Sequence, residues 1–181
     1  RILHSAMKNQ FLKLILVTKK LNCPVDQYLQ FIALMARSGV TAVQLREKNL
    51  HASELFSLGK ALHTLLQSFK IPLIINDYVD LCLELDAEGL HLGQDDGDVT
   101  KARQALGAKR IIGLSVNTLA QLKIANDLPL DYVGIGTIFP TKNKANTTTT
   151  WGIEALAQAV SISKHSVLAI GGIDQNNAQQ V

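Results

Sequence analysis

The sequence is poor in cysteine, in aromatic residues and in runs of like charge, and each shortage excludes a class of protein. Its two cysteines, Cys23 and Cys82, stand far apart without CxxC spacing, which indicates reduced thiols of a cytoplasmic protein rather than a disulfide framework or a zinc site. Aromatic residues make up only 5% of the chain and the net charge is only +3, so nothing indicates a nucleic-acid partner. No apolar run is long enough to span a membrane.

The first residues lack the features of a targeting segment. Residues 1–6 contain no apolar stretch of the kind found in signal peptides, and Met7 is a candidate initiating residue. We interpret residues 1–13 as an N-terminal extension, whose first six residues are either a remnant of cloning or the end of a preceding domain. Residues 14–181 are predicted to form a single domain, because a chain that is 47% hydrophobic can bury one sizeable core.

Strands and helices are predicted to alternate along this domain. Short apolar runs, typical of strands buried on both faces, occur at residues 14–17, 42–46, 72–75, 89–92, 110–114, 131–135 and 167–170. Between them, apolar residues spaced by three and four predict helices. Pro24 with Asp26 marks one helix start, Ser53 another, and Asn117 is a candidate cap. A last helix is predicted to begin at Asp174.

Seven such alternations without a hairpin signal predict an α/β protein with a parallel sheet, either open and doubly wound or closed as a TIM (β/α)8 barrel. The first strand–helix turn has no GxGxxG, and Gly134-Ile-Gly136 is a lone G-x-G. Nearly every strand ends in polar or glycine residues, which a barrel gathers at one face. We therefore favour a TIM barrel, and we expect its C-terminal strand to be missing from this sequence because only seven strands are found.

Three polar side chains share one face at the end of the second predicted strand. Gln44, Arg46 and Lys48 alternate with Val43 and Leu45, so they lie about 6–7 Å apart on the same side. Two cations placed in this way can bind one polyanion. The alternative interpretation is a solvated strand end whose cations pair with surface acids.

Carboxylates follow the next two predicted strands. Asp77 ends the third strand, and Asp95 and Asp96 lie after the fourth. Two carboxylates with open positions suit Mg²⁺, which takes its other ligands from water and substrate phosphates. Helix capping is the alternative role for an aspartate at a strand-to-helix turn.

Further candidates for phosphate binding lie late in the chain. Lys144, in the long polar loop after the sixth strand, would join Arg46 and Lys48 around the same phosphates. Gly171-Gly172 ends the seventh strand, where barrels commonly bind a phosphate through backbone N–H groups, although a plain tight turn would also explain the glycines.

Together these residues predict a metal-assisted diphosphate site and a separate monophosphate site. A reaction that expels diphosphate fits this arrangement, because cations stabilise the charge that develops on the leaving group. No Ser-His-Asp or Cys-His set is recognisable, so covalent catalysis is not supported. His91 is expected to line the barrel and to hydrogen-bond, either structurally or to a substrate ring.

Seven segments, in order and at matching spacing, resemble the thiamine phosphate synthase (thiamine-phosphate pyrophosphorylase) family. They are Gln44-Leu-Arg-Glu-Lys48, Ile75-Asn-Asp77 with Asp80-Leu81, His91-Leu-Gly-Gln-Asp-Asp96, Ile112-Gly-Leu-Ser115, Asp131-Tyr-Val-Gly134, Phe139-Pro-Thr141 with Lys144, and Ala169-Ile-Gly-Gly-Ile173. The resemblance covers the chain from about Leu14 to Ile173.

The resemblance implies a TIM-barrel transferase of the cytoplasm that joins a hydroxymethylpyrimidine diphosphate to a thiazole phosphate with Mg²⁺. It implies a dissociative mechanism, in which diphosphate leaves before the thiazole nitrogen attacks a pyrimidine-stabilised cation. The residues that would hold the pyrimidine diphosphate are Gln44, Arg46, Lys48, Asn76, Ser115 and Lys144. Those for the metal are Asp77 and Asp96, and those for the thiazole phosphate are Thr141, Asn143 and Gly172. Of these, Arg46, Lys48, Ser115 and Lys144 are the expected catalytic residues.

Three positions depart from the family pattern. Tyr78 replaces an arginine, Asn143 replaces a threonine, and Thr137 replaces a common proline. Two other functions are considered: a thiazole isomerase of the related regulator-like group, and a non-catalytic phosphate-binding barrel of the kind that could be one domain of a fused thiamine-pathway protein. Lys48, Asp96 and Lys144 argue against the isomerase, which has no diphosphate to expel.

Overall fold

The computed structural model describes residues 10–20, 22–141 and 150–181, which fall into two compact units. The first unit comprises the described residues through His91 together with Ala105–Ile111. The second comprises Leu92–Gln104 together with Ile112–Val181. That residues 14–181 form one domain, preceded by an extension at 1–13, stays a prediction.

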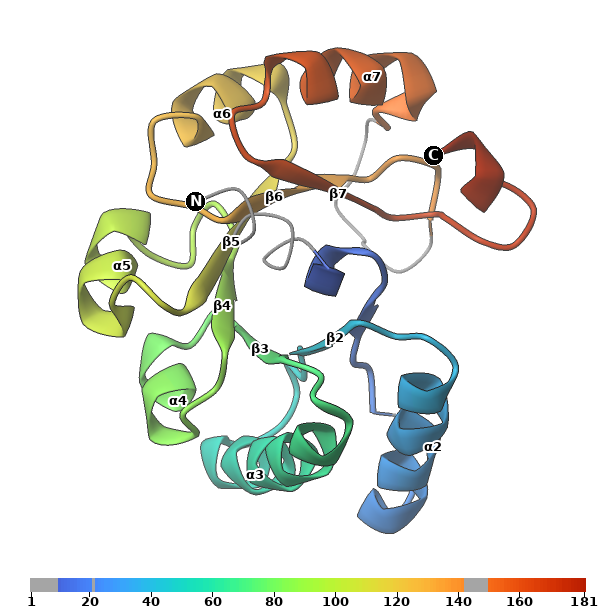
Figure 1. The fold of residues 1–181 in the computed structure, drawn as a ribbon, viewed down its shortest axis with the longest axis vertical. Helices are drawn as coiled ribbons and strands as arrows, with labels where there is room; N and C mark the ends of the chain where they lie inside the picture. Colours follow the sequence, from blue (N-terminus) through green and yellow to red (C-terminus); the bar gives the residue numbers. More distant parts are fainter. Residues whose placement is uncertain (1–9, 21, 142–149) are drawn as a thin grey trace. The chain divides into compact units, whose positions relative to one another are not determined.

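Parallel strands form the centre of the first unit. Its elements are η1 (Gln10–Leu12), β1 (Ile15–Val17), α2 (Val25–Arg37), β2 (Ala42–Leu45), α3 (Ala52–Phe69), β3 (Leu73–Asn76), α4 (Val79–Glu84) and β4 (Gly89–Leu92). Strand β1 pairs with β2, β2 with β3 and β3 with β4, each time in parallel. Helices α2, α3 and α4 lie on one side of these strands, as Figure 1 shows. The strands predicted here are confirmed to within one residue at each end.

The amphipathic sequence of α3 explains how this unit is packed. One side of the helix carries Leu55, Leu58, Leu62 and Leu66, all buried, because apolar residues spaced by three and four form one stripe. The helix begins at Ala52, one residue before the predicted start, since the Glu54 carboxylate accepts a hydrogen bond from the backbone N–H of residue 51 at 3.1 Å. Such a capping box satisfies backbone groups that a helix end leaves unpaired.

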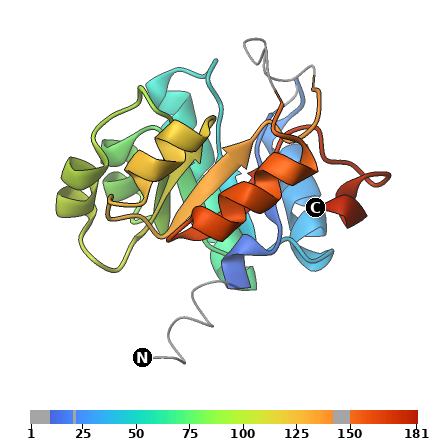
Figure 2. The ribbon, with the colours of Figure 1, turned by 90° about the horizontal axis from the view of Figure 1, so that it is seen from above.

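The second unit repeats the alternation of helix and parallel strand. The remaining elements are α5 (Val99–Leu106), β5 (Ile111–Val116), α6 (Leu119–Ala125), β6 (Tyr132–Gly136), α7 (Gly152–Ile162), β7 (Ser166–Ile170) and η2 (Ala178–Gln180). Strand β6 pairs in parallel with β5 on one side and β7 on the other. Helices α6 and α7 contact each other and lie side by side along β6 and β7 (Figures 1 and 2).

Two local predictions in the second unit are wrong. The cap of α6 is Thr118 rather than Asn117: the Thr118 hydroxyl accepts the Gln121 N–H at 3.2 Å. Asp174 does not begin an α-helix. Its carboxylate accepts the N–H of Asn176 at 2.7 Å, a side-chain-to-backbone bond that competes with helical hydrogen bonding, and only the short 3₁₀ turn η2 follows.

An acidic residue at the amino end of β4 anchors the preceding strand in the first unit. Glu88 lies directly before β4, and its Oε2 accepts the backbone N–H of Leu73, the first residue of β3, at 2.8 Å. Its Oε1 lies 3.1 Å from Nε2 of His63 on α3. The Glu88 carboxylate therefore connects the start of β4 with the start of β3 and with α3, the helix that precedes β3.

The second unit contains a matching anchor. Asp131 lies directly before β6, and its Oδ2 accepts the backbone N–H of Ile112 near the start of β5 at 2.9 Å. The same oxygen lies 2.6 Å from Nη2 of Arg103 on α5. A charged pair of this kind is stronger than a neutral hydrogen bond, so the amino end of β5 is held in the same way as that of β3.

The two cysteines are free thiols in different surroundings. Cys23 is partly exposed, whereas Cys82 is buried and its Sγ donates to the backbone oxygen of Gly89 at 3.3 Å. Burial raises the pKa of the Cys82 thiol to about 12, so it stays protonated and unreactive.

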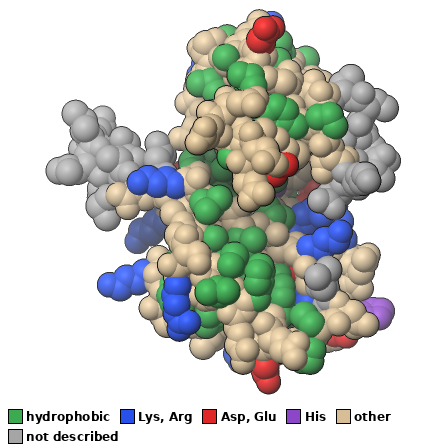
Figure 3. Space-filling model, turned by 90° about the vertical axis from the view of Figure 1, so that its right-hand side faces the viewer, with side chains coloured by type: hydrophobic (Ala, Val, Ile, Leu, Met, Phe, Trp, Pro, Cys, Tyr) green, Lys and Arg blue, Asp and Glu red, His purple; other side chains and the backbone are tan. Residues whose placement is uncertain are grey.

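No described helix is long and apolar enough to cross a membrane. The surface does carry exposed apolar side chains. In the space-filling view, hydrophobic side chains form several groups, and lysine and arginine side chains form smaller groups beside them (Figure 3). Phe31 and Leu34 on α2 are among the exposed apolar residues. Single exposed apolar residues are normal on folded proteins and indicate no binding function by themselves.

Candidate active site

In the first unit, the polar residues predicted on the second strand lie at the end of β2. Gln44 lies within β2 and is buried, while Arg46 and Lys48 follow the strand and are exposed. Gln44 stands beside Val17 of β1 and Ile74 of β3 in the register of the sheet. The two cations therefore follow a buried strand, and their common face with Gln44 stays a prediction.

Lys48 contacts one of the predicted metal ligands. Its Nζ lies 3.5 Å from Oδ2 of Asp77, whose side chain is only 13% exposed whereas that of Lys48 is 54% exposed. Asp77 adopts a left-handed backbone conformation, with φ of +69°, which is uncommon for a residue other than glycine. Its backbone N–H donates to the carbonyl oxygen of His91 at 2.9 Å. This bond fixes Asp77 where β3 ends.

Asn76 and His91 form a buried polar pair of neighbours within the sheet. Asn76 is the last residue of β3 and stands opposite His91 of β4 in the parallel register. Both are buried, and buried polar side chains are normally hydrogen-bonded. The first unit thus brings Asn76, Asp77 and Lys48 to neighbouring strand ends; their contact with a substrate or metal stays a prediction.

In the second unit, Asp96 belongs to a compact turn that also contacts Ser115. Its Oδ2 accepts the backbone N–H of Gly93 at 2.9 Å, and Gln94 of the same turn donates from Nε2 to the backbone oxygen of Ser115 at 2.5 Å. Ser115 itself is inside β5, beside Gly134 of β6. The fourth-strand turn and the fifth strand are therefore connected by a hydrogen bond.

Gly172 follows β7 in a conformation that only glycine adopts easily. Its φ is +70°, and an added Cβ would collide with the backbone carbonyl of Phe139. Phe139 also donates its N–H to the oxygen of Gly171 at 3.0 Å. Close packing against the loop after β6 is thus sufficient to explain the glycines, and their contact with a phosphate stays a prediction. Thr141 lies two residues beyond Phe139 and is partly exposed.

Asn143, Lys144 and residues 147–149 of the threonine run lie outside the described residues. Their predicted contacts with substrate stay predictions.

The donor set of the predicted metal ligands suits Mg²⁺. Among the described residues, no three His, Cys, Asp or Glu side chains gather in a way that could hold a metal ion, but Mg²⁺ needs only one or two carboxylates when substrate phosphates and water complete its shell. Asp77 supplies a largely covered carboxylate, and Asp96 has one oxygen bound to a backbone N–H. Each is an oxygen donor of the type that Mg²⁺ prefers.

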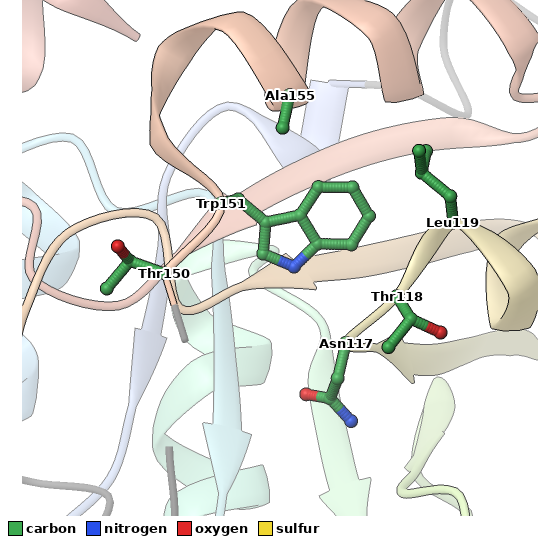
Figure 4. A pocket seen from close by; sticks show the side chains of 6 residues that line it. All are labelled: Asn117, Thr118, Leu119, Thr150, Trp151 and Ala155. Carbon is green, nitrogen blue, oxygen red and sulfur yellow. The ribbon is translucent and has the colours of Figure 1, made fainter. Parts of the chain in front are cut away.

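A small pocket in the second unit was not predicted from the sequence. It has a volume of about 180 Å³ and is lined by Asn117, Thr118, Leu119, Thr150, Trp151 and Ala155. Figure 4 shows the Trp151 indole between α7 and the loop that leads into α6. Its Nε1 is buried and has no hydrogen-bond partner among the residues that the structure describes. A lone tryptophan after a polar loop gave no sequence signal for this placement.

Buried polar residues next to β2 were also missed. Thr18 and Tyr28 are both buried in the first unit. Burial is the main cause that raises the pKa of Tyr28 to about 12, the nearby Glu47 carboxylate adds to it, and hydrogen bonds to Thr18 and to the backbone of Lys19 act against it. The only signal in the sequence was a threonine directly after an apolar strand.

Comparison with known proteins finds relatives over nearly the whole length of the chain. The family model described as "Thiamine monophosphate synthase" matches residues 14–181. A "Thiamine-phosphate synthase" of Chlamydia abortus is 52% identical over 175 residues, which is 97% of this chain and 82% of the relative, and one of Vibrio parahaemolyticus is 45% identical over 77% of this chain and 68% of the relative.

Solved structures agree with the fold. A thiamine phosphate pyrophosphorylase from Pyrococcus furiosus superposes with a TM-score of 0.83 at 33% identity, over 97% of this chain and 82% of that one. An N-acetylmannosamine-6-phosphate 2-epimerase from Clostridium perfringens, at 17% identity and a TM-score of 0.64, shares the fold alone. The predicted TIM-barrel class of α/β fold is thereby confirmed, with seven strands among the residues that the structure describes. The family model and the near-complete match to the Chlamydia relative show that the chain belongs to the thiamine monophosphate synthase family.

Proposed function

We propose that this chain, a transferase of thiamine biosynthesis, joins a hydroxymethylpyrimidine diphosphate to a thiazole phosphate and releases diphosphate. The observation that carries the proposal is the 52% identity to a thiamine-phosphate synthase over 97% of the chain. The strand ends of the first unit add support, because they hold two cations, an amide and a carboxylate at neighbouring positions. A reaction in the cytoplasm is part of the same proposal.

The first unit supplies most of the groups proposed to bind the pyrimidine diphosphate. Arg46 and Lys48 are exposed cations that follow a buried strand, so they can contact a polyanion without being desolvated first. The 3.5 Å separation between Lys48 and Asp77 is longer than a strong charge-assisted hydrogen bond, which leaves the ammonium able to turn toward the substrate. Gln44 and Asn76, both buried, offer amide donors and acceptors for the pyrimidine.

Asp77 and Asp96 are the proposed ligands of Mg²⁺. When bound, the ion would neutralise charge on the diphosphate oxygens and so assist their departure. The Asp77 carboxylate contacts Lys48 and the Asp96 carboxylate accepts the N–H of Gly93, so each carboxylate is oriented by the protein. Such orientation reduces the reorganisation that binding requires.

The second unit is proposed to supply Ser115 for the diphosphate and Thr141 with Gly172 for the thiazole phosphate. Lys144 would join the diphosphate site and Asn143 the thiazole phosphate site, as the family resemblance implies. Ser115 lies in a strand and Gly172 lies two residues after one, which suits groups that must meet a phosphate at a fixed position.

The proposed reaction is a dissociative substitution. The bond between the pyrimidine methylene carbon and the diphosphate oxygen breaks first, and its electron pair leaves with the oxygen. The ring nitrogen of the thiazole then uses its lone pair to form the new carbon–nitrogen bond. Arg46, Lys48 and Lys144 stabilise the negative charge that grows on the leaving diphosphate, and this charge is greatest in the transition state.

Diphosphate release in the presence of Mg²⁺ tests the proposal. The purified natural protein is mixed with both substrates, and the reaction is repeated with each substrate omitted. We expect release only when both are present, and near-complete loss in Asp77→Ala and Lys144→Ala. A folded protein that releases no diphosphate would instead favour a phosphate-binding barrel, and conversion of the thiazole alone would favour an isomerase.

A further inference from the structure

The ends of β1 and β2 are connected by a buried threonine hydroxyl. The backbone N–H of Thr18 donates to the oxygen of Gln44 at 2.8 Å and so continues the parallel ladder one residue beyond β1. The Thr18 Oγ1 then accepts the backbone N–H of Arg46 at 2.9 Å. Since the Thr18 residue is only 3% exposed, water cannot easily replace this acceptor.

A second bond connects the same two segments one step further along. The backbone N–H of Lys20 donates to Oε1 of Glu47 at 2.7 Å. The residue that follows Arg46 is therefore also tied to the loop after β1. Arg46 and Glu47, which directly follow β2, are thus both held by residues of the loop after β1.

Tyr28 on α2 supports this connection from the side of the helix. Its residue is 6% exposed, and its hydroxyl hydrogen-bonds to Thr18 and to the backbone of Lys19. Because the pKa of Tyr28 is raised to about 12, mainly by burial, the phenol keeps its proton throughout the physiological range. The Thr18 hydroxyl thus has the neutral Tyr28 hydroxyl as a hydrogen-bonding neighbour at every physiological pH.

We propose that Thr18 is a positioning residue of the reaction: its buried hydroxyl fixes the backbone at Arg46 and thereby the direction in which Arg46 and Lys48 meet the diphosphate. The inference rests on the proposed function in assigning the diphosphate to these two cations. A long cationic side chain binds a phosphate well only if its backbone is fixed, since misplacement of the reacting groups by about 1 Å lowers rates about 10²-fold.

Thr18→Val tests the hydroxyl alone, because valine keeps the shape and removes the acceptor. The Arg46 N–H then lacks its buried partner, and an unpaired buried donor is unfavourable. The backbone at Arg46 is therefore free to move away from the position that suits diphosphate binding. We expect the KM for the pyrimidine diphosphate to rise about tenfold and the KM for the thiazole phosphate to stay unchanged. Thr18→Ser retains the hydroxyl and should restore the wild-type KM.

Thr41→Val is the matched control. Thr41 precedes β2 at its opposite end, and its Oγ1 accepts the Leu14 N–H at 2.9 Å and donates to the Phe11 oxygen at 2.8 Å. The control removes the same chemical group from the opposite end of the β1–β2 pair, so it should lower the melting temperature without raising either KM. An equal rise in the pyrimidine KM for Thr41→Val, or no rise for Thr18→Val, overturns the inference.

Two further measurements separate this inference from the proposed function. Residue-resolved amide hydrogen exchange should be faster at Arg46 in Thr18→Val and unchanged there in Thr41→Val. Titration calorimetry with inorganic diphosphate and MgCl₂ should give about tenfold weaker binding for Thr18→Val only. If the wild-type protein binds diphosphate but has no synthase activity, the positioning role stands and the synthase role falls. Unchanged exchange and unchanged diphosphate affinity in Thr18→Val refute the positioning role, whatever the activity.

Discussion

Replacing Lys48 by glutamine should separate catalysis from stability. The Lys48–Asp77 pair is 3.5 Å long and the lysine side chain is 54% exposed. Exposed pairs of this kind contribute about 0.2–1 kcal/mol. In a chain of this size, 1 kcal/mol corresponds to about 2–4 °C of melting temperature. Lys48→Gln should therefore unfold within about 4 °C of the wild type.

The effect on activity should be far larger. In the proposed complex the ammonium forms a charge-assisted hydrogen bond with the leaving diphosphate, and such bonds contribute about 1.5–3 kcal/mol. Because about 1.4 kcal/mol corresponds to a factor of ten, kcat/KM for diphosphate release should fall about 10- to 150-fold. The loss should appear in kcat as well as in KM, since the charge on diphosphate grows as it leaves.

The assay is steady-state diphosphate release, with a melting curve for each variant. Lys164→Gln is the control, because its Nζ lies 2.8 Å from Asp127 in an ion pair in which both side chains are exposed. We expect this control to keep wild-type kcat/KM. If kcat/KM of Lys48→Gln stays within about twofold of wild type while the control behaves as stated, the assignment of Lys48 to the leaving group is refuted.

Two more predictions concern stability. Glu88→Ala removes the acceptor for the Leu73 N–H and the partner of His63. Unfolding should become easier by about 2 kcal/mol, or about 4–8 °C in melting temperature, and Glu88→Gln, which keeps an acceptor, should lose less; equal losses would contradict this reasoning. Tyr28→Phe should flatten the alkaline loss of stability measured by urea unfolding. The pKa of Tyr28 rises from 10.0 to about 12 on folding, so its contribution is complete below pH 10 and is lost as the pH rises toward 12. An unchanged slope over that range would contradict the assignment.

The sequence predicted the strands well because each is a continuous apolar run. A residue such as Ile74 is buried and its neighbours are buried too, so composition alone marks the element. The candidate residues at strand ends followed from the same pattern, since Asn76 and Asp77 come directly after such a run. Helix caps were less predictable: Asn117 and Thr118 are both good caps by type, and only the backbone conformation decides between them.

The contacts that the sequence did not predict all depend on side-by-side placement. Thr18 and Arg46 are 28 positions apart and meet only because β1 and β2 are paired in one particular register. The contact between Lys48 and Asp77 requires the pairing of β2 with β3 in the same way. The backbone N–H of Trp151 donates to the oxygen of Thr137, 14 positions earlier in the chain, at 2.9 Å. Such neighbours cannot be derived from spacing along one chain.

The acids at the amino ends of the strands have a consequence for how the protein can evolve. Glu88 and Asp131 each accept a hydrogen bond from a backbone N–H of the preceding strand and contact a basic side chain of the helix before that strand. The sequences around the two acids differ. A shift of one residue in the pairing of either strand would turn every side chain to the opposite face. The two carboxylates therefore help to fix the strand register. Because these hydrogen bonds hold the amino ends of the strands, substitutions in the loops at the carboxyl ends can change the chemistry of the site without shifting the strand register. The residues that hold β3 and β5 in register therefore lie at the amino ends of these strands, and the candidate site residues Asp77 and Ser115 lie toward their carboxyl ends.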